Sequence, residues 1–162
     1  MASEKLIRIS SFIRRKPGVS KEEFYQYWTQ VHGPLCTDFM MRHGVVEYVQ
    51  AHTTDETKAL GAAMAKAAGR DMQPWDGFTD AYVRDFATFE DAFKDPEYLE
   101  KIRPDELAFI DVETLQMTIG YNYEVIKSGE KVKEHARSFE KPARDLMAES
   151  KESQELLESL KK

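Results

Sequence analysis

The chain has 162 residues, of which 41% are hydrophobic and 32% charged, and its formal net charge is −6. This composition is typical of one globular domain with a sizeable core. The negative charge argues against nucleic acid or an anionic membrane as the main partner, because both repel an acidic surface. Cys36 is the sole cysteine, which excludes an intramolecular disulfide and a cysteine-rich metal cluster.

Targeting and membrane signals are not recognisable in the chain. The segment from Met1 to Lys5 lacks the apolar core of a signal peptide, and no apolar run is long enough to span a bilayer. We therefore expect a cytoplasmic protein that binds neither nucleic acid nor membrane.

The N-terminal part contains a strand and a clearly marked helix start. Residues 5–14 alternate isoleucine with polar side chains, which predicts a strand. Ser20 and Glu23 then form a capping box, and Phe24 and Trp28 follow at helical spacing. We therefore predict a helix from residue 21 whose apolar face turns inward.

His32 lies one turn beyond Trp28 on the apolar face of this helix. We expect Gly33 and Pro34 to stop the helix there, because proline lacks an amide hydrogen and restricts the residue before it. A contact between His32 and Cys36, four residues further on, is therefore not expected. Cys36 is interpreted as a small buried residue.

The later elements are predicted from periodicity and turn residues. They are a helical stretch over residues 35–42, a strand over 45–52, an Ala-rich helix over 54–70, a strand over 78–86, a helix capped by Thr88 and split by Pro96, a helical turn over 104–110, and a strand over 115–126. This order indicates the α+β class and a ferredoxin-like β-α-β-β-α-β sheet with helices on one face.

The second face of such a sheet also carries apolar groups and needs a cover. A second copy of the chain is the plainest cover, so we predict a homodimer in which two sheets pack together. Residues 5–127 are predicted to form the domain, and residues 128–162 a helical C-terminal extension. Within it, Val132, Ala136 and Phe139 keep helical spacing up to a break at Pro142.

Several kinds of active site are excluded by missing patterns. The histidines, His32, His43, His52 and His135, show no metal-binding spacing. Phosphate-binding glycine loops and a Gly-x-Ser-x-Gly nucleophile turn are also absent. Acid–base chemistry by His, Tyr and Asp side chains, without metal or nucleotide cofactor, is what remains.

Three residues are candidates for proton transfer, and each has a structural alternative. His32 either acts as the acid–base group or suits the negative end of its helix dipole. Asp111 either ends a helix or accepts a hydrogen bond from His32 and sets the tautomer of its ring. His52 is either a catalytic group or a hydrogen-bonded residue of the sheet.

The aromatic residues suggest a pocket for a flat aromatic substrate. The candidate substrate-binding residues are Tyr25, Trp28, Tyr48, Phe78, Tyr82 and Arg84. Tyr25 and Trp28 are also expected to belong to the core. Arg84 either pairs with Asp80 or binds a substrate carboxylate.

The order of several short motifs resembles the EthD-domain family. The motifs are Arg14-Arg15-Lys16-Pro17-Gly18-Val19-Ser20, Glu23-Phe24-Tyr25-Gln26-Tyr27-Trp28, His32-Gly33-Pro34-Leu35, Tyr48-Val49-Gln50-Ala51-His52, Trp75-Asp76-Gly77-Phe78, Phe89-Glu90-Asp91-Ala92-Phe93, and Asp105-Glu106 with Phe109-Ile110-Asp111. The likeness covers residues 5–127. It implies a dimeric α+β barrel without a bound cofactor, with His32 at the mouth of its cavity.

Relatives of this type in fungal aromatic-polyketide pathways include decarboxylases and dehydratases. The resemblance therefore implies a cofactor-free lyase of secondary metabolism, acting on a small aromatic-polyketide intermediate through His32. One alternative is a cofactor-independent monooxygenase of the anthrone type or a polyketide cyclase, since related barrels include both. Another alternative is a non-catalytic dimeric barrel that binds a small molecule. Fold alone does not choose among them.

Overall fold

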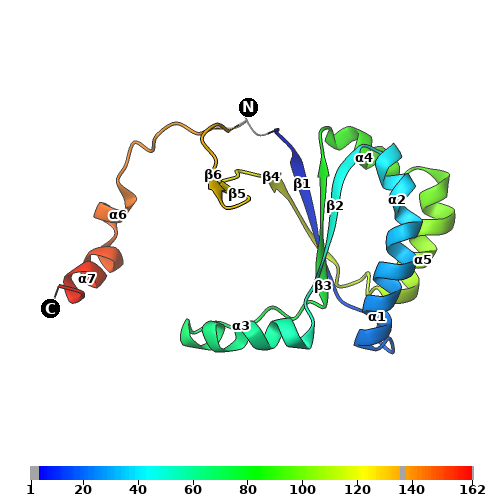
Figure 1. The fold of residues 1–162 in the computed structure, drawn as a ribbon, viewed down its shortest axis with the longest axis horizontal. Helices are drawn as coiled ribbons and strands as arrows, with labels where there is room; N and C mark the ends of the chain where they lie inside the picture. The colour runs from blue at the N-terminus through cyan, green and yellow to red at the C-terminus, as the bar shows by residue number, and fades with distance from the viewer. Residues whose placement is uncertain (1–3, 136–137, 162) are drawn as a thin grey trace.

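The computed structural model describes residues 4–135 and 138–161 and is built on a four-stranded antiparallel sheet (Figure 1). The strands are β1 (Ile7–Ile13), β2 (Val45–His52), β3 (Gly77–Val83) and β4 (Gln116–Tyr121). Their order across the sheet is β2-β3-β1-β4, so each βαβ unit encloses one strand of the other. The predicted α+β, ferredoxin-like arrangement is confirmed.

The connections of these two units form a helix layer on one face of the sheet (Figure 1). The first connection comprises α1 (Lys21–Tyr27), the π turn η1 (Trp28–His32) and α2 (Gly33–Arg42). The second comprises α4 (Phe86–Ala92), the π turn η2 (Tyr98–Ile102) and α5 (Arg103–Phe109). Between sheet and helices, Phe24 and Trp28 are fully buried and Phe109 is nearly so, which removes large aromatic surfaces from water.

Helix starts follow the capping rules, with one correction. The capping box of α1 is present, since the Ser20 hydroxyl accepts from the Glu23 amide and the Glu23 carboxylate accepts from the Ser20 amide. The cap of α4 is Asp85 rather than the predicted Thr88, because the Asp85 carboxylate accepts the amides of Ala87 and Thr88. The Thr88 hydroxyl donates to the same carboxylate.

The prediction that Gly33 and Pro34 stop the first helix is wrong. The Gly33 amide donates to the Trp28 carbonyl, five residues back, and α2 continues directly with Pro34 in its first turn. A π turn widens the helix by one residue and so accommodates a proline that has no amide hydrogen to give. His32 therefore lies inside a continuous helical segment and not at a helix end.

The second connection repeats this arrangement. The Arg103 amide donates to the Tyr98 carbonyl, and Pro104 follows in the first turn of α5. The predicted break near Pro96 is also present, because α4 already ends at Ala92. In both connections of the fold, a π turn is therefore followed by one residue and then by a proline.

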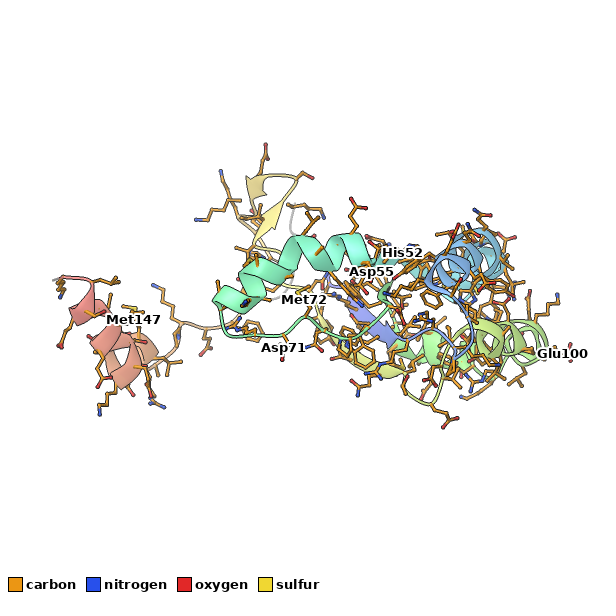
Figure 2. All side chains as sticks on the ribbon, turned by 90° about the horizontal axis from the view of Figure 1, so that it is seen from below. His52, Asp55, Asp71, Met72, Glu100 and Met147 are labelled. Atoms are coloured by element: carbon orange, nitrogen blue, oxygen red, sulfur yellow. The ribbon has the colours of Figure 1, made fainter. Side chains whose placement is uncertain are left out.

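The Ala-rich insertion between β2 and β3 forms a helix as predicted, α3 (Asp55–Ala67), and the structure shows that Thr54 is its cap. Figures 1 and 2 show α3 extending from the His52 end of β2, on the side of the sheet opposite the helix layer. Leu60 and Met64 on this helix are strongly exposed. No helix among residues 4–135 and 138–161 has the length and apolar character needed to cross a bilayer.

The C-terminal part differs from the prediction. β4 ends at Tyr121, and a small hairpin follows, formed by β5 (Ile126–Lys127) and β6 (Glu130–Lys131). The helix predicted after residue 130 is absent from the described residues up to 145, and Ala136 lies outside the described residues. Charged residues separate the apolar ones there, so an isolated helix gains little burial. The division at residue 127 stays a prediction.

Two short helices end the chain. They are α6 (Leu146–Glu149) and α7 (Lys151–Ser159), which Figure 1 shows away from the sheet at the end of an extended segment. Both leave their leucines exposed and bury no residue.

The Trp28 side chain packs against the sheet at Gly77. A Cβ atom at Gly77 would lie 2.5 Å from Trp28 Cζ3 and 2.7 Å from the Ala51 carbonyl oxygen. Gly77→Ala is therefore expected to lower the free energy of unfolding by about 1–3 kcal/mol, because a well-packed core resists added volume. Chemical denaturation followed by far-UV circular dichroism measures this change.

Gly120→Ala is the matched control, since no heavy atom lies within 4 Å of a Cβ at that position of β4. It should change the free energy of unfolding by less than about 0.5 kcal/mol. Equal losses in the two variants would contradict a specific packing of Trp28 against Gly77.

Candidate functional site

A cavity of about 270 Å³ lies between the sheet and the helix layer. Its lining is mostly apolar, and its volume is near the lower end for small-molecule sites. The lining residues that have ionisable or strongly polar side chains are His32, Cys36, Tyr48, Tyr98, Arg103 and Glu106. A few convergent polar groups in an apolar cavity are the usual arrangement of a site that orients a small organic molecule.

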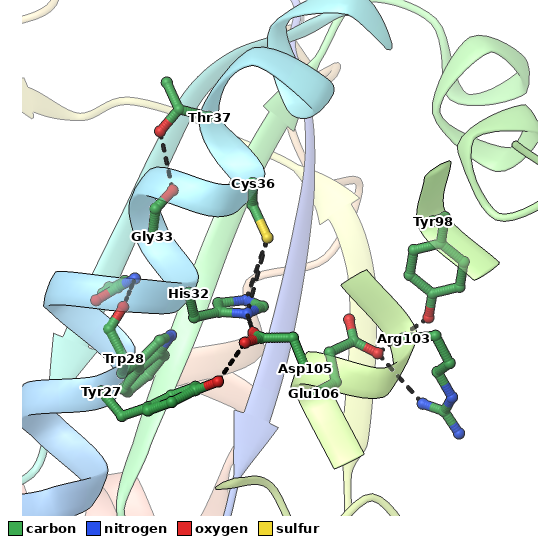
Figure 3. Close-up of polar contacts among 11 residues, drawn as sticks. Tyr27, Trp28, His32, Gly33, Cys36, Thr37, Tyr98, Arg103, Asp105 and Glu106 are labelled. Atoms are coloured by element: carbon green, nitrogen blue, oxygen red, sulfur yellow. Dashed lines mark hydrogen bonds and ion pairs between the residues drawn. The ribbon is translucent and has the colours of Figure 1, made fainter. Parts of the chain in front are cut away.

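His32 is held by a carboxylate that sequence reasoning did not assign to it. Its Nδ1 lies 2.7 Å from Oδ2 of Asp105, and each side chain is only 9% exposed (Figure 3). The Tyr27 hydroxyl donates to Oδ1 of the same carboxylate at 2.5 Å. Because an ionised carboxylate only accepts hydrogen bonds, the hydrogen of this contact belongs to Nδ1, and in the neutral form of the ring Nε2 has the lone pair.

Tyr27 and Asp105 fix this arrangement together. The hydrogen bond to Asp105, followed by burial, raises the pKa of the Tyr27 phenol to about 12. Tyr27 therefore stays protonated and keeps donating throughout the physiological range. Two donors on one carboxylate hold its plane, which in turn holds the imidazole ring in one orientation.

Cys36 contacts His32, contrary to the sequence-based expectation. The Cys36 sulfur lies 3.6 Å from Nε2 and 3.7 Å from Nδ1, because the helix continues through Gly33 and places residues 32 and 36 one turn apart. Burial raises the pKa of this thiol to about 12, with smaller contributions from Glu106 and Asp105. Cys36 is thus a neutral thiol beside the ring and not an activated nucleophile.

Two further donors lie on the cavity wall. Burial raises the pKa of Tyr48 to about 12, and the Trp28 and Gln50 side chains oppose that rise. The Trp28 indole nitrogen is buried and makes no hydrogen bond of good geometry among the described residues. A neutral phenol and an indole N–H in the lining of the same cavity as His32 can each donate to an oxygen atom of a bound molecule.

A second polar group lies on the other side of α5 (Figure 3). The Tyr98 hydroxyl donates to Oε2 of Glu106 at 3.0 Å, and Nη1 of Arg103 donates to the same oxygen at 3.3 Å. Asp105 and Glu106, neighbours in sequence, thus serve different sides of the cavity. Among the described residues, no group of three or more His, Cys, Asp or Glu side chains is arranged to hold a metal ion.

The structure brings together only part of the residues predicted for catalysis. His32 lines the cavity, whereas Asp111 and His52 are not among the lining residues. The partner predicted for His32 was Asp111, but Asp105 fills that place. Asp111 follows α5, where its amide donates to the Arg14 carbonyl at 2.9 Å.

The predicted substrate-binding residues divide in the same way. Trp28 and Tyr48 line the cavity, and the other four residues do not. Phe78 and Tyr82 alternate with Thr79 and Ala81 of the cavity lining, so they belong to the opposite sheet face.

Tyr25 and Arg84 are engaged elsewhere. The Tyr25 hydroxyl donates to the Asp76 carbonyl at 2.8 Å. Arg84 pairs with Glu4 at the surface and not with the predicted partner Asp80, which instead binds Arg8 through two hydrogen bonds of 2.8 Å.

Sequence reasoning missed Tyr27, Asp105, Tyr98, Arg103 and Glu106. The usable signal was the repeated pattern of an aromatic residue followed six positions later by proline, at Trp28 and Pro34 and again at Tyr98 and Pro104. This pattern marks both π turns, and both contribute residues to the cavity.

The comparisons with known proteins agree with one another. The family model "EthD domain" matches residues 16–113. "Dehydratase aurZ" of Gibberella zeae is 30% identical over 118 residues, 73% of this chain and 78% of the relative. "Decarboxylase claH" of Passalora fulva is also 30% identical over 118 residues, 73% of this chain and 77% of the relative.

A solved structure of an ethyl tert-butyl ether D (EthD) family protein from Bacillus halodurans is similar at a TM-score of 0.48 and 14% identity. It covers 74% of this chain and 100% of its own.

His52 stacks between two aromatic rings at the base of the helix layer. Its ring lies 4.8 Å from the ring of Trp28 and 5.0 Å from that of Tyr25, in both cases nearly parallel. Burial lowers the pKa of His52 below its ordinary value of 6.5. The unfolded chain therefore takes up a proton there before the folded chain does, so this contribution to stability is lost as the pH falls below 6.5.

His52→Phe retains a flat ring and removes the titration. Its melting temperature is expected to fall less than that of the wild-type protein when the pH is lowered from 7.5 to about 5. Differential scanning calorimetry at the two pH values measures this difference. Equal decreases in the two proteins would contradict a lowered pKa for His52.

Proposed function

Because the chain belongs to the EthD-domain family, we propose that it is a cofactor-free lyase that acts on an aromatic-polyketide intermediate. Relatives named as a dehydratase and as a decarboxylase share about three quarters of its length, which supports a lyase of secondary metabolism. The 2.7 Å contact between His32 Nδ1 and Asp105 Oδ2 carries the mechanistic part of the proposal, because it leaves Nε2 as the proton-transfer atom.

In a dehydration, Nε2 of His32 removes the proton from the carbon next to a carbonyl group. The electrons of the broken C–H bond pass into the carbonyl, whose oxygen becomes an enolate. The neutral Tyr48 phenol, with its pKa of about 12, donates a hydrogen bond to that oxygen. The protonated His32 then returns the proton to the departing hydroxyl group, and water leaves as the carbon–carbon double bond forms.

In the decarboxylation of a β-keto acid, the same groups act in the reverse protonation order. The bond to the carboxyl carbon breaks, carbon dioxide leaves, and its electron pair forms the enolate. A protonated His32, with Asp105 facing its other nitrogen, then gives its proton to the carbon atom. The Nε2 atom of His32 thus acts as a base in the first step of dehydration, whereas in decarboxylation it acts as an acid after the carbon–carbon bond has broken.

A homodimer is part of the proposed working form. The sheet face opposite the helix layer presents Phe12, Phe78 and Tyr82, together with Val49, which is 42% exposed. The Arg8–Asp80 ion pair lies on the same face, and apolar side chains left on an open sheet face are usually covered in an assembly. The same face of a second copy would bury it symmetrically and keep both cavities on the outer sides.

The central prediction concerns His32 and its carboxylate. His32→Asn should abolish turnover of an aromatic β-keto acid or β-hydroxy ketone intermediate, because it removes the proton-transfer group. Asp105→Asn should lower kcat by about 10²–10⁴-fold, because an amide also donates and no longer fixes the tautomer. Mass spectrometry of the product distinguishes loss of carbon dioxide from loss of water.

Asp111→Asn is the control, since that carboxylate does not line the cavity. It should retain wild-type turnover. Full activity in a folded His32→Asn protein would overturn the proposed mechanism.

Oligomeric state is tested separately by Val49→Asp, which places a charge on the uncovered sheet face. Sedimentation velocity should show a dimer for the wild-type protein and a monomer for this variant, because burying an unpaired carboxylate is costly. Val31→Asp is the matched control, since Val31 is 44% exposed in the helix layer. A monomeric wild-type protein would contradict the proposed dimer.

A further inference from the structure

The cavity has one cationic side chain in its lining among the described residues, Arg103. It follows the π turn η2, whose wider path places Tyr98 and Arg103 above one another, five residues apart. Glu106 comes three residues later, on the same side of α5. The sequence itself thus builds a Tyr–Arg–Glu group at the cavity, separate from the group around His32.

Most hydrogen-bonding capacity of Arg103 is unused. The guanidinium has five N–H donors in a planar fork, of which Nη1 donates to Glu106 at 3.3 Å and a second contact involves the Tyr98 hydroxyl. The Arg103 side chain is 42% exposed, in contrast to the 9% exposed His32. Arg103 therefore stands at the open part of the cavity with Glu106 and Tyr98 as its side-chain partners, and its guanidinium has more N–H donors than these two contacts use.

Tyr98 and Glu106 hold the fork in place. Burial first, and then the Glu106 carboxylate, raise the pKa of Tyr98 to about 12, so its hydroxyl stays a donor to Glu106. Both described contacts use Oε2 of Glu106, which pins one edge of the guanidinium beside α5. The remaining edge has the geometry that binds a carboxylate through two parallel hydrogen bonds.

We propose that Arg103 is a specificity-determining residue that binds an anionic oxygen group of an aromatic ligand, a carboxylate or an ionised phenol, at the cavity mouth. The proposal rests on the proposed function in one respect, namely that the aromatic body of the ligand lies in the apolar cavity beside His32. The other sequence candidate for this role, Arg84, is occupied by Glu4 at the surface.

The charge expected of the ligand follows from the charges of Arg103 and Glu106. Glu106 offsets part of the positive charge of Arg103, so the site should favour an anion moderately and release it readily. Removal of the Arg103 charge should weaken anion binding, and removal of the Glu106 charge should strengthen it. A purely structural ion pair gives neither result selectively, because loss of either partner would then disturb neutral and anionic ligands alike.

The test uses two bicyclic probes of nearly equal shape, 2-naphthoate and its neutral amide, 2-naphthamide. Isothermal titration calorimetry with the full chain measures both dissociation constants at pH 7. The wild-type protein should bind naphthoate at least tenfold more tightly than naphthamide, as expected for a charge-assisted pair. Arg103→Met should remove that difference while leaving naphthamide binding within about twofold of wild type.

Glu106→Gln is the companion variant, because glutamine keeps the length and one acceptor oxygen for Tyr98 but has no charge. It should increase the affinity for naphthoate severalfold and leave naphthamide unchanged. Arg103→Lys retains the charge without the planar fork and should give an intermediate preference. A thermal melt of each variant shows whether it is folded.

The proposal is overturned if wild-type protein binds naphthoate no more tightly than naphthamide, or binds neither. It is also overturned if folded Arg103→Met keeps the preference. The result is independent of turnover, since the dissociation constants of two unreactive probes are measured without any catalysed reaction. If the proposed lyase activity is not found, the binding test of Arg103 can still be interpreted. If Arg103 shows no effect on binding, the proposed role of His32 is not affected.

Discussion

Two prolines, which have no amide hydrogen, determine the course of both helical connections of the fold. Pro34 and Pro104 each lie in a helical connection that must cross the sheet without a break, and neither can donate the hydrogen bond of a regular α-helix. The chain meets this constraint in both places with a π turn whose closing donor is the residue before the proline. One π turn places Trp28 and His32 in the lining of the cavity, and the other places Tyr98 and Arg103 there. The form of the cavity therefore depends on these two turns.

Side-chain packing around Trp28 holds the first π turn in place. Trp28 reaches the sheet only because Gly77 has no side chain, and His52 covers the same ring from β2. The buried face of the first π turn is therefore locked between strand and helix. His32 is fixed twice over, by its backbone within this turn and by the carboxylate that Tyr27 holds in place. In the proposed mechanism, preorganisation of this kind would let a single imidazole act without reorienting during proton transfer.

The order of strands and helices along the chain and the capping box were predictable because each depends on local periodicity, turn residues or capping residues. Ile7, Ile9 and Ile13 alternate in β1, and Ser20 with Glu23 marks α1. His32 was also predictable as a candidate, since it continues the apolar face of Trp28. These features need no knowledge of what lies across the core.

The partners of His32 were not predictable, because they depend on which turn of α5 meets η1 in space. Asp105 and Asp111 are equally plausible acids in the sequence, and only the fold places the first against the ring. A proline in a sequence usually indicates the end of a helix, but a π turn allows this helix to continue. The contact between Cys36 and His32 therefore could not be predicted. Sheet parity likewise decides that Tyr48 faces the cavity while Phe78 and Tyr82 face away from it.

The two π turns give the halves of the chain matching positions. Trp28 and Tyr98 stand six residues before the two prolines, and Cys36 and Glu106 stand two residues after them, yet all four side chains line one cavity. Equivalent scaffold positions thus carry an indole and a thiol in one half, and a phenol and a carboxylate in the other. The two halves nevertheless meet at α5, where Asp105 holds His32 of the first half and its neighbours Arg103 and Glu106 form the second polar group. A substitution in this single helical turn can therefore disturb both the proposed proton transfer and the proposed anion binding.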